Sequence, residues 1–148
     1  MNTEINKTNA ECEIRELLDN WLKAVCVWDI DGIMSHYAPD VRAFDAVSQL
    51  QFKGAEVYQK HWEACRAMCP GPMVFEVHEV NLVAGDDVAF MTALNRCGGT
   101  GENGEEKLGW MRMTACYRKI DGHWKIAHEH FSVPFDMVTC KPLFDLQP

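Results

Sequence analysis

DGHWKIAHEHFSVP, residues 121–134, is the stretch of sequence that decides the fold. Its Asp121-Gly122 pair is the strongest short-range signal for a tight β-hairpin, because such a turn needs positive φ angles that these residue types tolerate. Strand-like sequence lies on both sides of the pair, in residues 108–120 and 123–133. The sequence therefore predicts that the last part of the core is an antiparallel hairpin.

The last predicted strand presents two different faces, because side chains alternate across a strand. One face carries Trp124, Ile126, His128, His130 and Ser132, and it changes from apolar to polar along the chain. This order is typical of a strand that closes a core at its start and lines a cavity at its end. We therefore predict that His128, His130 and Ser132 face a pocket.

The strand before the Asp121-Gly122 turn supplies candidate neighbours for the two histidines. If its Arg112 and Thr114 face inward, they approach the histidines, and a buried Arg then needs a carboxylate or a ligand anion. The opposite face is an equally good core face, so the sequence leaves the choice open. The two faces are Arg112, Thr114 and Cys116 on one side, and Met111, Met113 and Tyr117 on the other.

A second hairpin is predicted upstream, with strands over residues 74–84 and 88–96 around Gly85-Asp86-Asp87. Between the two hairpins, residues 97–106 are rich in glycine and acidic. A phosphate-binding loop would need a Lys-Ser/Thr ending and a following helix, and both are missing here. We predict a mobile hairpin loop instead.

Three helices are predicted before the strands. A capping box at Thr8-Asn9-Ala10-Glu11 opens the first, and apolar residues recur behind it at helical spacing. Asp29 or Asp31 caps a short second helix that runs through Tyr37, and the turn Ala38-Pro39-Asp40 stops it. An extended piece covers residues 41–46, and a third helix follows Gly54. The predicted apolar stripe of this third helix is Tyr58, His61, Trp62, Cys65 and Met68.

Helices followed by an antiparallel meander predict an α+β fold. We expect a cone-shaped α+β barrel, in which the three N-terminal helices pack on a strongly curved, mostly antiparallel sheet. No linker or repeat divides the 148 residues, so one domain over residues 1–148 is predicted, with its core at 8–135 and a C-terminal tail at 136–148. A cone of this kind has one open end, which holds a pocket.

Composition excludes several classes of partner. The net charge is −8 and the pI is about 5.1, whereas nucleic-acid binding needs a basic surface. No apolar run is long enough to span a bilayer, and the polar, mixed-charge start is unlike a secretory signal. Seven cysteines without regular spacing favour a reducing compartment over a disulfide framework. The sequence therefore predicts a cytoplasmic protein that binds neither nucleic acid nor membrane.

Asp45 is a carboxylate inside an apolar run, residues 43–47. It is either turned to solvent at a strand edge or buried for a purpose, and the sequence by itself leaves both open. The His128-x-His130 pair also invites a metal ion, because both rings project in the same direction. No third ligand stands at a diagnostic spacing, and the Cys65/Cys69 pair is more typical of core or surface cysteines. We predict no metal and no cofactor.

Two segments resemble a known superfamily. Residues 28–41, with Phe44-Asp45 and Phe52-Lys53-Gly54, resemble the first half of ketosteroid isomerase-like proteins. Residues 121–134 resemble the C-terminal signature of SnoaL-like domains. Both groups belong to the nuclear transport factor 2-like superfamily, and the resemblance covers roughly residues 12–135. It implies a cone-shaped α+β barrel, a pocket at the wide end and a homodimer that packs through the sheet.

The resemblance also implies roles for single residues. The general base of the isomerases, on the strand after the second helix, corresponds to Asp45. The two acids that bind the dienolate oxygen in those enzymes correspond to Trp21 and to Cys116 or a neighbour of it. Trp is no acid and Cys is a poor donor, so steroid isomerisation is not expected here.

Two functions remain as hypotheses. In the first, an enzyme of the isomerase, dehydratase or polyketide cyclase type uses Asp45 to abstract a proton alpha to a carbonyl. His128, His130, Arg112 and Ser132 then donate to the carbonyl oxygen. In the second, the chain is a non-catalytic ligand-binding or oligomerisation module, similar to the association domain of calcium/calmodulin-dependent kinase II. The expected ligand is a small apolar or carbonyl-bearing molecule, and further predicted pocket residues are Trp21, Tyr58, Trp62, Thr114 and Cys116.

Overall fold

The first half of the chain holds all the described helices and two strands, and the second half holds four long strands and a C-terminal segment. The structure is a computed structural model that describes residues 2–69, 71–100 and 103–148, with side chains in the first helix from Asn9 onward. The described elements are α1 (Asn2–Cys26), α2 (Ile30–Met34), β1 (Tyr37–Phe44), β2 (Phe52–Lys53), α3 (Ala55–Met68), β3 (Met73–Ala84), β4 (Val88–Thr100), β5 (Glu106–Ile120) and β6 (His123–Ser132).

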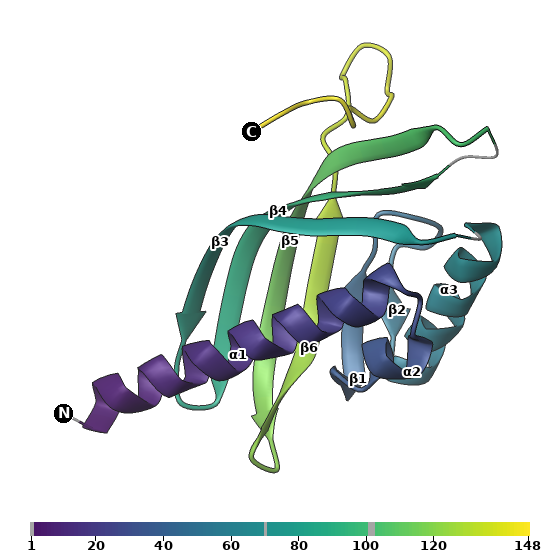
Figure 1. Ribbon diagram of the computed structural model, residues 1–148. Coiled ribbons are helices and arrows are strands. Elements are labelled where there is room, and N and C mark those ends of the chain that lie inside the picture. The colour runs from purple at the N-terminus through teal and green to yellow at the C-terminus, as the bar shows by residue number, and fades with distance from the viewer. Residues whose placement is uncertain (1, 70, 101–102) are drawn as a thin grey trace.

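The strands form one sheet in the order β2-β1-β6-β5-β4-β3. β1 and β6 run parallel, and the other neighbouring strands pair antiparallel. In Figure 1, α1 crosses one face of the sheet, and α2 and α3 lie beside the C-terminal end of α1. The predicted α+β class, with N-terminal helices on a mostly antiparallel sheet, is confirmed.

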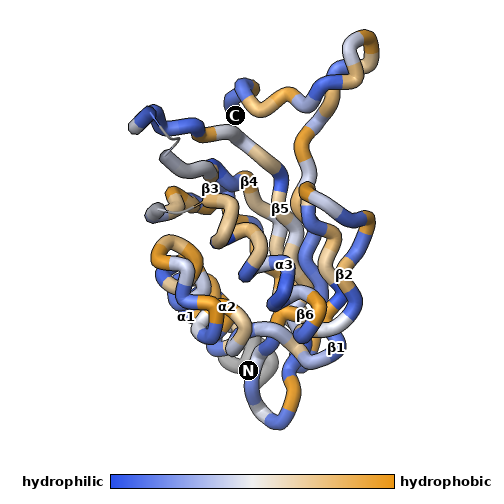
Figure 2. Tube along the Cα trace, turned by 90° about the vertical axis from the view of Figure 1, so that its right-hand side faces the viewer, coloured by the Kyte–Doolittle hydropathy of each residue, from blue (hydrophilic) through white to orange (hydrophobic). Residues whose placement is uncertain are grey.

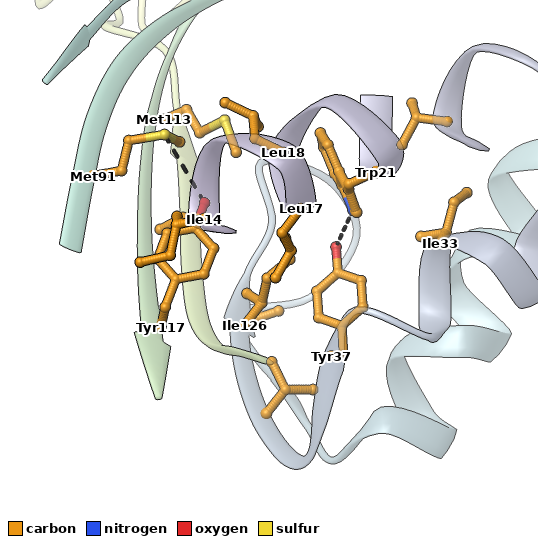
Figure 3. Packing of buried hydrophobic residues seen from close by; sticks show 14 of the residues in the cluster. Ile14, Leu17, Leu18, Trp21, Ile33, Tyr37, Met91, Met113, Tyr117 and Ile126 are labelled. Atoms are coloured by element: carbon orange, nitrogen blue, oxygen red, sulfur yellow. Dashed lines mark hydrogen bonds between the residues drawn. The ribbon is translucent and has the colours of Figure 1, made fainter. Parts of the chain in front are cut away.

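The core lies between α1 and the sheet. The predicted apolar face of α1 is buried, with Ile14, Trp21 and Val25 no more than 1% exposed. Figure 3 shows this face against side chains from the central strands, among them Met113 and Ile126. Full burial of a side chain of this size contributes roughly 1.5–3 kcal/mol, so this layer supplies much of the stability that holds the helix on the sheet.

The helix boundaries differ from the predicted ones. α1 begins at Asn2, so Thr8 lies inside the helix and the predicted capping box is wrong. Asp29 does cap α2, because its Oδ1 accepts the Gly32 N–H at 3.1 Å. α2 ends at Met34, however, and residues 38–40 belong to β1 rather than to a turn. The β1–β6 register is interrupted between Tyr37 and Arg42, so Pro39 is accommodated where its missing N–H costs no ladder bond.

The two hairpins lie where the sequence predicts them. Asp121 and Gly122 have φ angles of 50° and 80°, as the predicted tight turn requires. The loop predicted over residues 97–106 is wrong at both ends, because β4 continues to Thr100 and β5 begins at Glu106. Residues 101 and 102 lie outside the described residues. Within the predicted loop the two strands pair, Gly98 with Leu108 and Gly99 with Lys107.

Gly98 is a position where a side chain is not tolerated. A Cβ added there would overlap the backbone oxygen of Lys107 on β5, whereas a Cβ at Gly99 meets nothing within 4 Å. We expect Gly98→Ala to lower the free energy of unfolding by about 1–3 kcal/mol, because the strand backbone must move to relieve the overlap. Urea denaturation measures the change. Gly99→Ala is the matched control, and equal stability of the two variants would contradict the close approach.

The segment after β6 folds back towards β5. The Trp110 N–H donates to the Phe144 oxygen at 3.1 Å, and Asp136 holds a turn in which its Oδ1 accepts the N–H groups of Val138 and Thr139. Figure 2 shows this segment projecting beyond the sheet, with hydrophobic positions along it. Met137 and Val138 are 88% and 92% exposed.

None of the described helices combines the length and the apolar character needed to cross a membrane.

Candidate functional site

A bulge in β6 decides which of its residues face the interior. Tyr117 on β5 pairs with Ile126, but the preceding Cys116 pairs with His128, so Ala127 is an extra residue in β6. The alternation therefore shifts by one position. Trp124 and Ile126 face the core before the bulge, and Glu129 and Phe131 face it afterwards. The predicted common face of Trp124, Ile126, His128, His130 and Ser132 is wrong for its last three members.

The outer face of the sheet collects most of the polar residues that the sequence singles out. Arg112, Thr114 and Cys116 on β5 pair with Ser132, His130 and His128 on β6, and Met113, Ala115 and Tyr117 take the inner face. The Arg112 Nε–H donates to Ser132 Oγ at 3.0 Å. These residues are together, as predicted, but on the side of the sheet away from the helices. Their role in binding stays a prediction.

The two histidines on the outer face both pack against one aromatic ring. The ring of Phe44 packs edge-on against His128 at 4.8 Å and His130 at 5.4 Å between centroids. His128 Nδ1 lies 2.6 Å from the backbone oxygen of Arg42, so this nitrogen carries the hydrogen and donates it. His130 has no such partner among the described residues and is exposed. Of the two, His130 is therefore the histidine with a ring that is free to bind.

A chain of buried polar groups occupies the inner face instead. The Trp21 Nε1–H donates to the Tyr37 hydroxyl at 3.0 Å, which Figure 3 shows between α1 and β1. Tyr37 in turn donates to Glu129 Oε1 at 2.6 Å. Glu129 is fully buried, and its second oxygen, Oε2, has no hydrogen-bond partner among the described residues. The Trp21 N–H is thus engaged with the hydroxyl that donates to this buried carboxyl.

Asp45 belongs to the same network. The Tyr58 hydroxyl lies 2.9 Å from Glu129 Oε1 and 3.1 Å from Asp45 Oδ2. Asp45 Oδ2 also lies 3.3 Å from His61 Nε2, and its Oδ1 accepts the Val47 N–H at 3.2 Å. The Asp45 side chain is 18% exposed and that of His61 is 6% exposed. Of the two alternatives for Asp45, the structure therefore has the inward one, with the carboxylate held at the border of the core.

Burial changes the acid–base properties of this network. Desolvation raises the pKa of Glu129 to about 7, against the hydrogen bonds from Tyr37 and Tyr58, which lower it, and with a contribution from the negative charge of Asp45. Desolvation also raises the pKa of both tyrosines well above the usual range, and the nearby Glu129 adds to it. The tyrosines therefore remain hydroxyl donors, while Glu129 can change its charge near neutral pH.

Cys65 and His61 do not form a nucleophilic pair. Cys65 Sγ lies 3.7 Å from His61 Nε2, but Asp45 contacts the same ring nitrogen. An activated nucleophile and its orienting carboxylate use opposite nitrogens of the histidine. Burial also raises the pKa of the Cys65 thiol, and Asp45 and Cys69 raise it further, so the unreactive thiol form is favoured.

Aromatic side chains from the helices fill the space beside this network. Trp62 packs edge-on against Trp21 and against Trp28, at 6.2 Å between centroids in each case. Tyr58 stacks on His61 at 5.8 Å. Trp21, Tyr58 and Trp62 are all buried, so in this structure they build the core around Asp45. Their predicted contact with a ligand is not tested by these distances.

Two hollows open near the site. One, of about 560 Å³, lies between the end of α3 and the ends of β3–β5, and its lining includes Trp28, Met68, Met73 and Lys107. The other, of about 750 Å³, is more open and is lined by Phe44, residues 45–51 and His130. Asp45 and His130 therefore share one surface depression. His128 lines neither of these two hollows, and the predicted pocket with Asp45 and both histidines stays a prediction.

Three residues of the network were not predicted as site residues. Strict alternation places Glu129 on the face opposite His128 and His130, because the bulge at Ala127 is not visible in the sequence pattern. Tyr37 was assigned to the end of a helix, although it begins β1. His61 was recognised only as part of the buried stripe of α3. Its position one turn after Tyr58 was the available signal, because residues spaced three or four apart share a helix face.

Metal ligands are not grouped in the described part of the chain: there, no three His, Cys, Asp or Glu side chains come close enough together to hold an ion. Within the network of Asp45, His61, Tyr58 and Glu129, burial gives Glu129 an acidity that lets it gain or lose a proton near neutral pH. Such buried groups with altered acidity are typical of functional sites.

The family model described as "SnoaL-like domain" matches residues 14–136. The chain belongs to the SnoaL-like family. This SnoaL-like chain is also similar to a solved NTF2-like protein of unknown function from Pseudomonas putida KT2440, with 50% sequence identity, a TM-score of 0.89 and coverage of 95% of this chain and 98% of that chain. The resemblance stated from the sequence is thereby confirmed. No curated protein matches the chain.

More distant structures share the fold of this SnoaL-like chain. A candidate dehydratase of the NTF2-like family from Streptomyces avermitilis has 15% identity and a TM-score of 0.75, with coverage of 84% of this chain and 95% of that chain. The association domain of C. elegans CaMKII has 16% identity and a TM-score of 0.69, with coverage of 85% and 97%. At these identities the likeness concerns the fold alone, which hosts both enzymes and assembly domains.

Proposed function

We propose that this SnoaL-like chain binds a small carbonyl-bearing molecule in the depression at Asp45 and His130 and abstracts a proton alpha to the carbonyl. Asp45 is the general base, and the class of reaction is that of isomerases, dehydratases and cyclases. The observation that carries the proposal is the setting of Asp45: its carboxylate is oriented by Val47, Tyr58 and His61, and its side chain is 18% exposed at the depression.

Hydrogen-bond partners on both oxygens of a carboxylate favour a role as base because they orient the group. They hold the oxygens in one orientation, so a bound substrate meets a preformed geometry rather than a mobile side chain. His130 lines the same depression and is exposed, so it is the donor that we assign to the carbonyl oxygen. Arg112 and Ser132 hydrogen-bond to each other on the outer face and are not needed for this reaction.

Deuterium exchange tests the proposal without a known substrate. The wild-type chain is incubated in D₂O with a panel of small aliphatic, aromatic and cyclic ketones, and mass spectrometry follows deuterium at the alpha carbon. We expect at least one compound to exchange faster with the wild-type chain than with Asp45→Asn. Exchange at the same rate with both proteins for every compound that binds, or no binding of any compound, would contradict the proposal. Mass spectrometry of molecules that co-purify with the protein widens the panel.

The second candidate function is a non-catalytic binding or assembly module. The observation that favours it is the cluster of His128, His130, Arg112 and Ser132 on the outer face, where a partner has access. In the exchange experiment this module predicts ligand binding without any difference between wild type and Asp45→Asn. The two candidate functions are therefore separated by one measurement.

A homodimer that packs through the outer face of the sheet is also part of the proposal. Val83 and Phe90 pair across β3 and β4, and with Val88 they leave apolar side chains 40–59% exposed on this face. Exposed apolar groups gathered in this way are typical of interfaces.

We expect the wild-type chain to be a dimer at micromolar concentration and Phe90→Asp to be a monomer, because a carboxylate cannot be desolvated in an apolar interface. Size-exclusion chromatography with light scattering measures both. Val27→Asp, at a position 72% exposed after α1, is the control and should remain a dimer. A monomeric wild type, or a dimeric Phe90→Asp, would refute this interface.

A further inference from the structure

The hydroxyl of Tyr58 lies between two carboxyl groups and cannot donate to both. It is 2.9 Å from Glu129 Oε1 and 3.1 Å from Asp45 Oδ2, and a tyrosine hydroxyl has a single hydrogen. One of the two carboxyl oxygens therefore lies beside the lone pairs of Tyr58. Two negative charges at these distances from one buried hydroxyl are unfavourable unless one carboxyl carries a proton.

Glu129 is the carboxyl suited to carry that proton. It is fully buried, whereas the Asp45 side chain is 18% exposed and also receives the Val47 N–H. When Glu129 is protonated on Oε1, it can donate to the Tyr58 oxygen, and Tyr58 then donates to Asp45. When Glu129 is ionised, Tyr58 is drawn towards Glu129, and Asp45 loses this donor. Burial of Glu129 raises its pKa to about 7, so the protonated and the ionised states of Glu129 are both accessible near neutral pH.

We infer that Tyr58 and Glu129 are positioning residues for Asp45: the protonation of Glu129 decides, through the direction in which the Tyr58 hydroxyl points, whether Asp45 is a stabilised carboxylate or a more ready proton acceptor. This inference rests on the proposed function for its catalytic meaning. It deepens that function, because Asp45 is then the better proton acceptor when the buried Glu129 has lost its proton. The change involves a turn of the Tyr58 O–H bond and the gain or loss of one proton by Glu129, and no other bond is made or broken.

Other titratable groups near the network have defined places. Tyr37 on β1 donates to Glu129, and His61 on α3 contacts Asp45. The negative charge of Glu129 contributes to raising the pKa of Tyr117 on β5. The negative charge of Asp45 contributes to raising the pKa of the thiols of Cys65 on α3 and Cys97 on β4. Burial raises the pKa of Tyr37, Tyr117 and both thiols, so none of these four ionises in the neutral range. His61 contacts Asp45 directly, so its ring signals are followed separately.

A carbon-13 NMR titration of the carboxyl groups tests the inference without any substrate. The side-chain carboxyl signals of Asp45 and Glu129 are followed from pH 4 to 9 in labelled wild-type protein, and the ring signals of His61 are followed in parallel. We expect the Asp45 signal to show its own transition and a second one that coincides with the titration of Glu129. Glu129→Gln should abolish the second transition, because an amide has no proton to lose in this range.

Two tyrosine variants separate the hydroxyl switch from simple charge repulsion. Tyr58→Phe removes the shared hydroxyl, and we expect the second Asp45 transition to shrink severalfold while Glu129 still titrates. Tyr37→Phe is the matched control: it removes another donor to Glu129 but not the link to Asp45, so the second transition should persist. The inference is overturned if wild type lacks the second transition, if that transition follows His61 instead of Glu129, or if Tyr58→Phe leaves it at full size. Should Tyr58→Phe fail to fold, wild type and Glu129→Gln still show whether Asp45 responds to the titration of Glu129, and the inference is overturned if it does not.

This titration and the exchange assay fail independently. If Asp45→Asn exchanges as fast as wild type, the proposed reaction is wrong, whereas the coupled transitions can still be present. If the transitions are not coupled but Asp45→Asn abolishes exchange, Asp45 is the base and the switch is wrong. If the proposed reaction and the switch are both correct, the exchange rate of wild type should rise with pH through the titration of Glu129. The exchange rate of Glu129→Gln should not rise in this way.

Discussion

Asp45→Asn is expected to lower the rate of alpha-proton exchange by about 100- to 10,000-fold, the range typical of losing a general base. Asn keeps the size of the side chain and can still accept hydrogen bonds from Val47 and Tyr58, so the fold around it should survive. What it cannot do is accept the substrate proton. We therefore expect the loss in turnover and not in ligand affinity. Exchange measured by mass spectrometry, together with ligand binding measured by thermal shift, separates the two.

Asp40→Asn is the matched control for this variant. Asp40 lies on β1, the strand that Asp45 directly follows, and it pairs with Arg118 on the surface at 2.8 Å. It does not line the depression and contacts neither Tyr58 nor Glu129, so its exchange rate should equal that of wild type. If Asp40→Asn lost as much activity as Asp45→Asn, the effect would come from the strand or the net charge rather than from a base at Asp45.

Glu129→Gln is expected to remove a large part of the pH dependence of stability. The pKa of Glu129 is raised in the folded chain from 4.5 to about 7, so the folded state binds the proton more tightly than the unfolded state does. The stability from this group is full below about pH 4.5 and is lost as the pH rises to about 7. At 1.36 kcal/mol per pKa unit, the wild-type chain should lose roughly 3 kcal/mol more than Glu129→Gln over this range.

Urea denaturation at a series of pH values measures this difference. Other groups, such as His36, whose pKa is lowered mainly by burial, add their own pH dependence, but they are present in both proteins and cancel. Glu16→Gln, an exposed position on α1, serves as the control and should follow the wild-type curve. Parallel curves for wild type and Glu129→Gln would mean that Glu129 is not protonated preferentially in the folded state.

The site illustrates how far a strand pattern can be read. Alternation assigned His128, His130 and Ser132 to the inner face, and the extra residue Ala127 reversed the assignment for everything after it. A bulge has no reliable signature in a single sequence, because any residue can be the inserted one. On β5 the pattern had two acceptable faces, and only packing against α1 selected Met113 and Tyr117 as the inner residues.

The sequence alone determined the order of the elements, the Asp121-Gly122 hairpin, the apolar face of α1 and the family, because these depend on neighbours along the chain and on local turn chemistry. It also determined that Asp45 is a candidate base, through the resemblance. The tertiary structure alone decided that Asp45, Tyr58 and Glu129 meet, since Asp45 follows β1, Tyr58 lies on α3, and Glu129 lies on β6, 71 positions after Tyr58. Sequence spacing carries no information about such contacts, whereas the curvature and bulge of a packed sheet fix them.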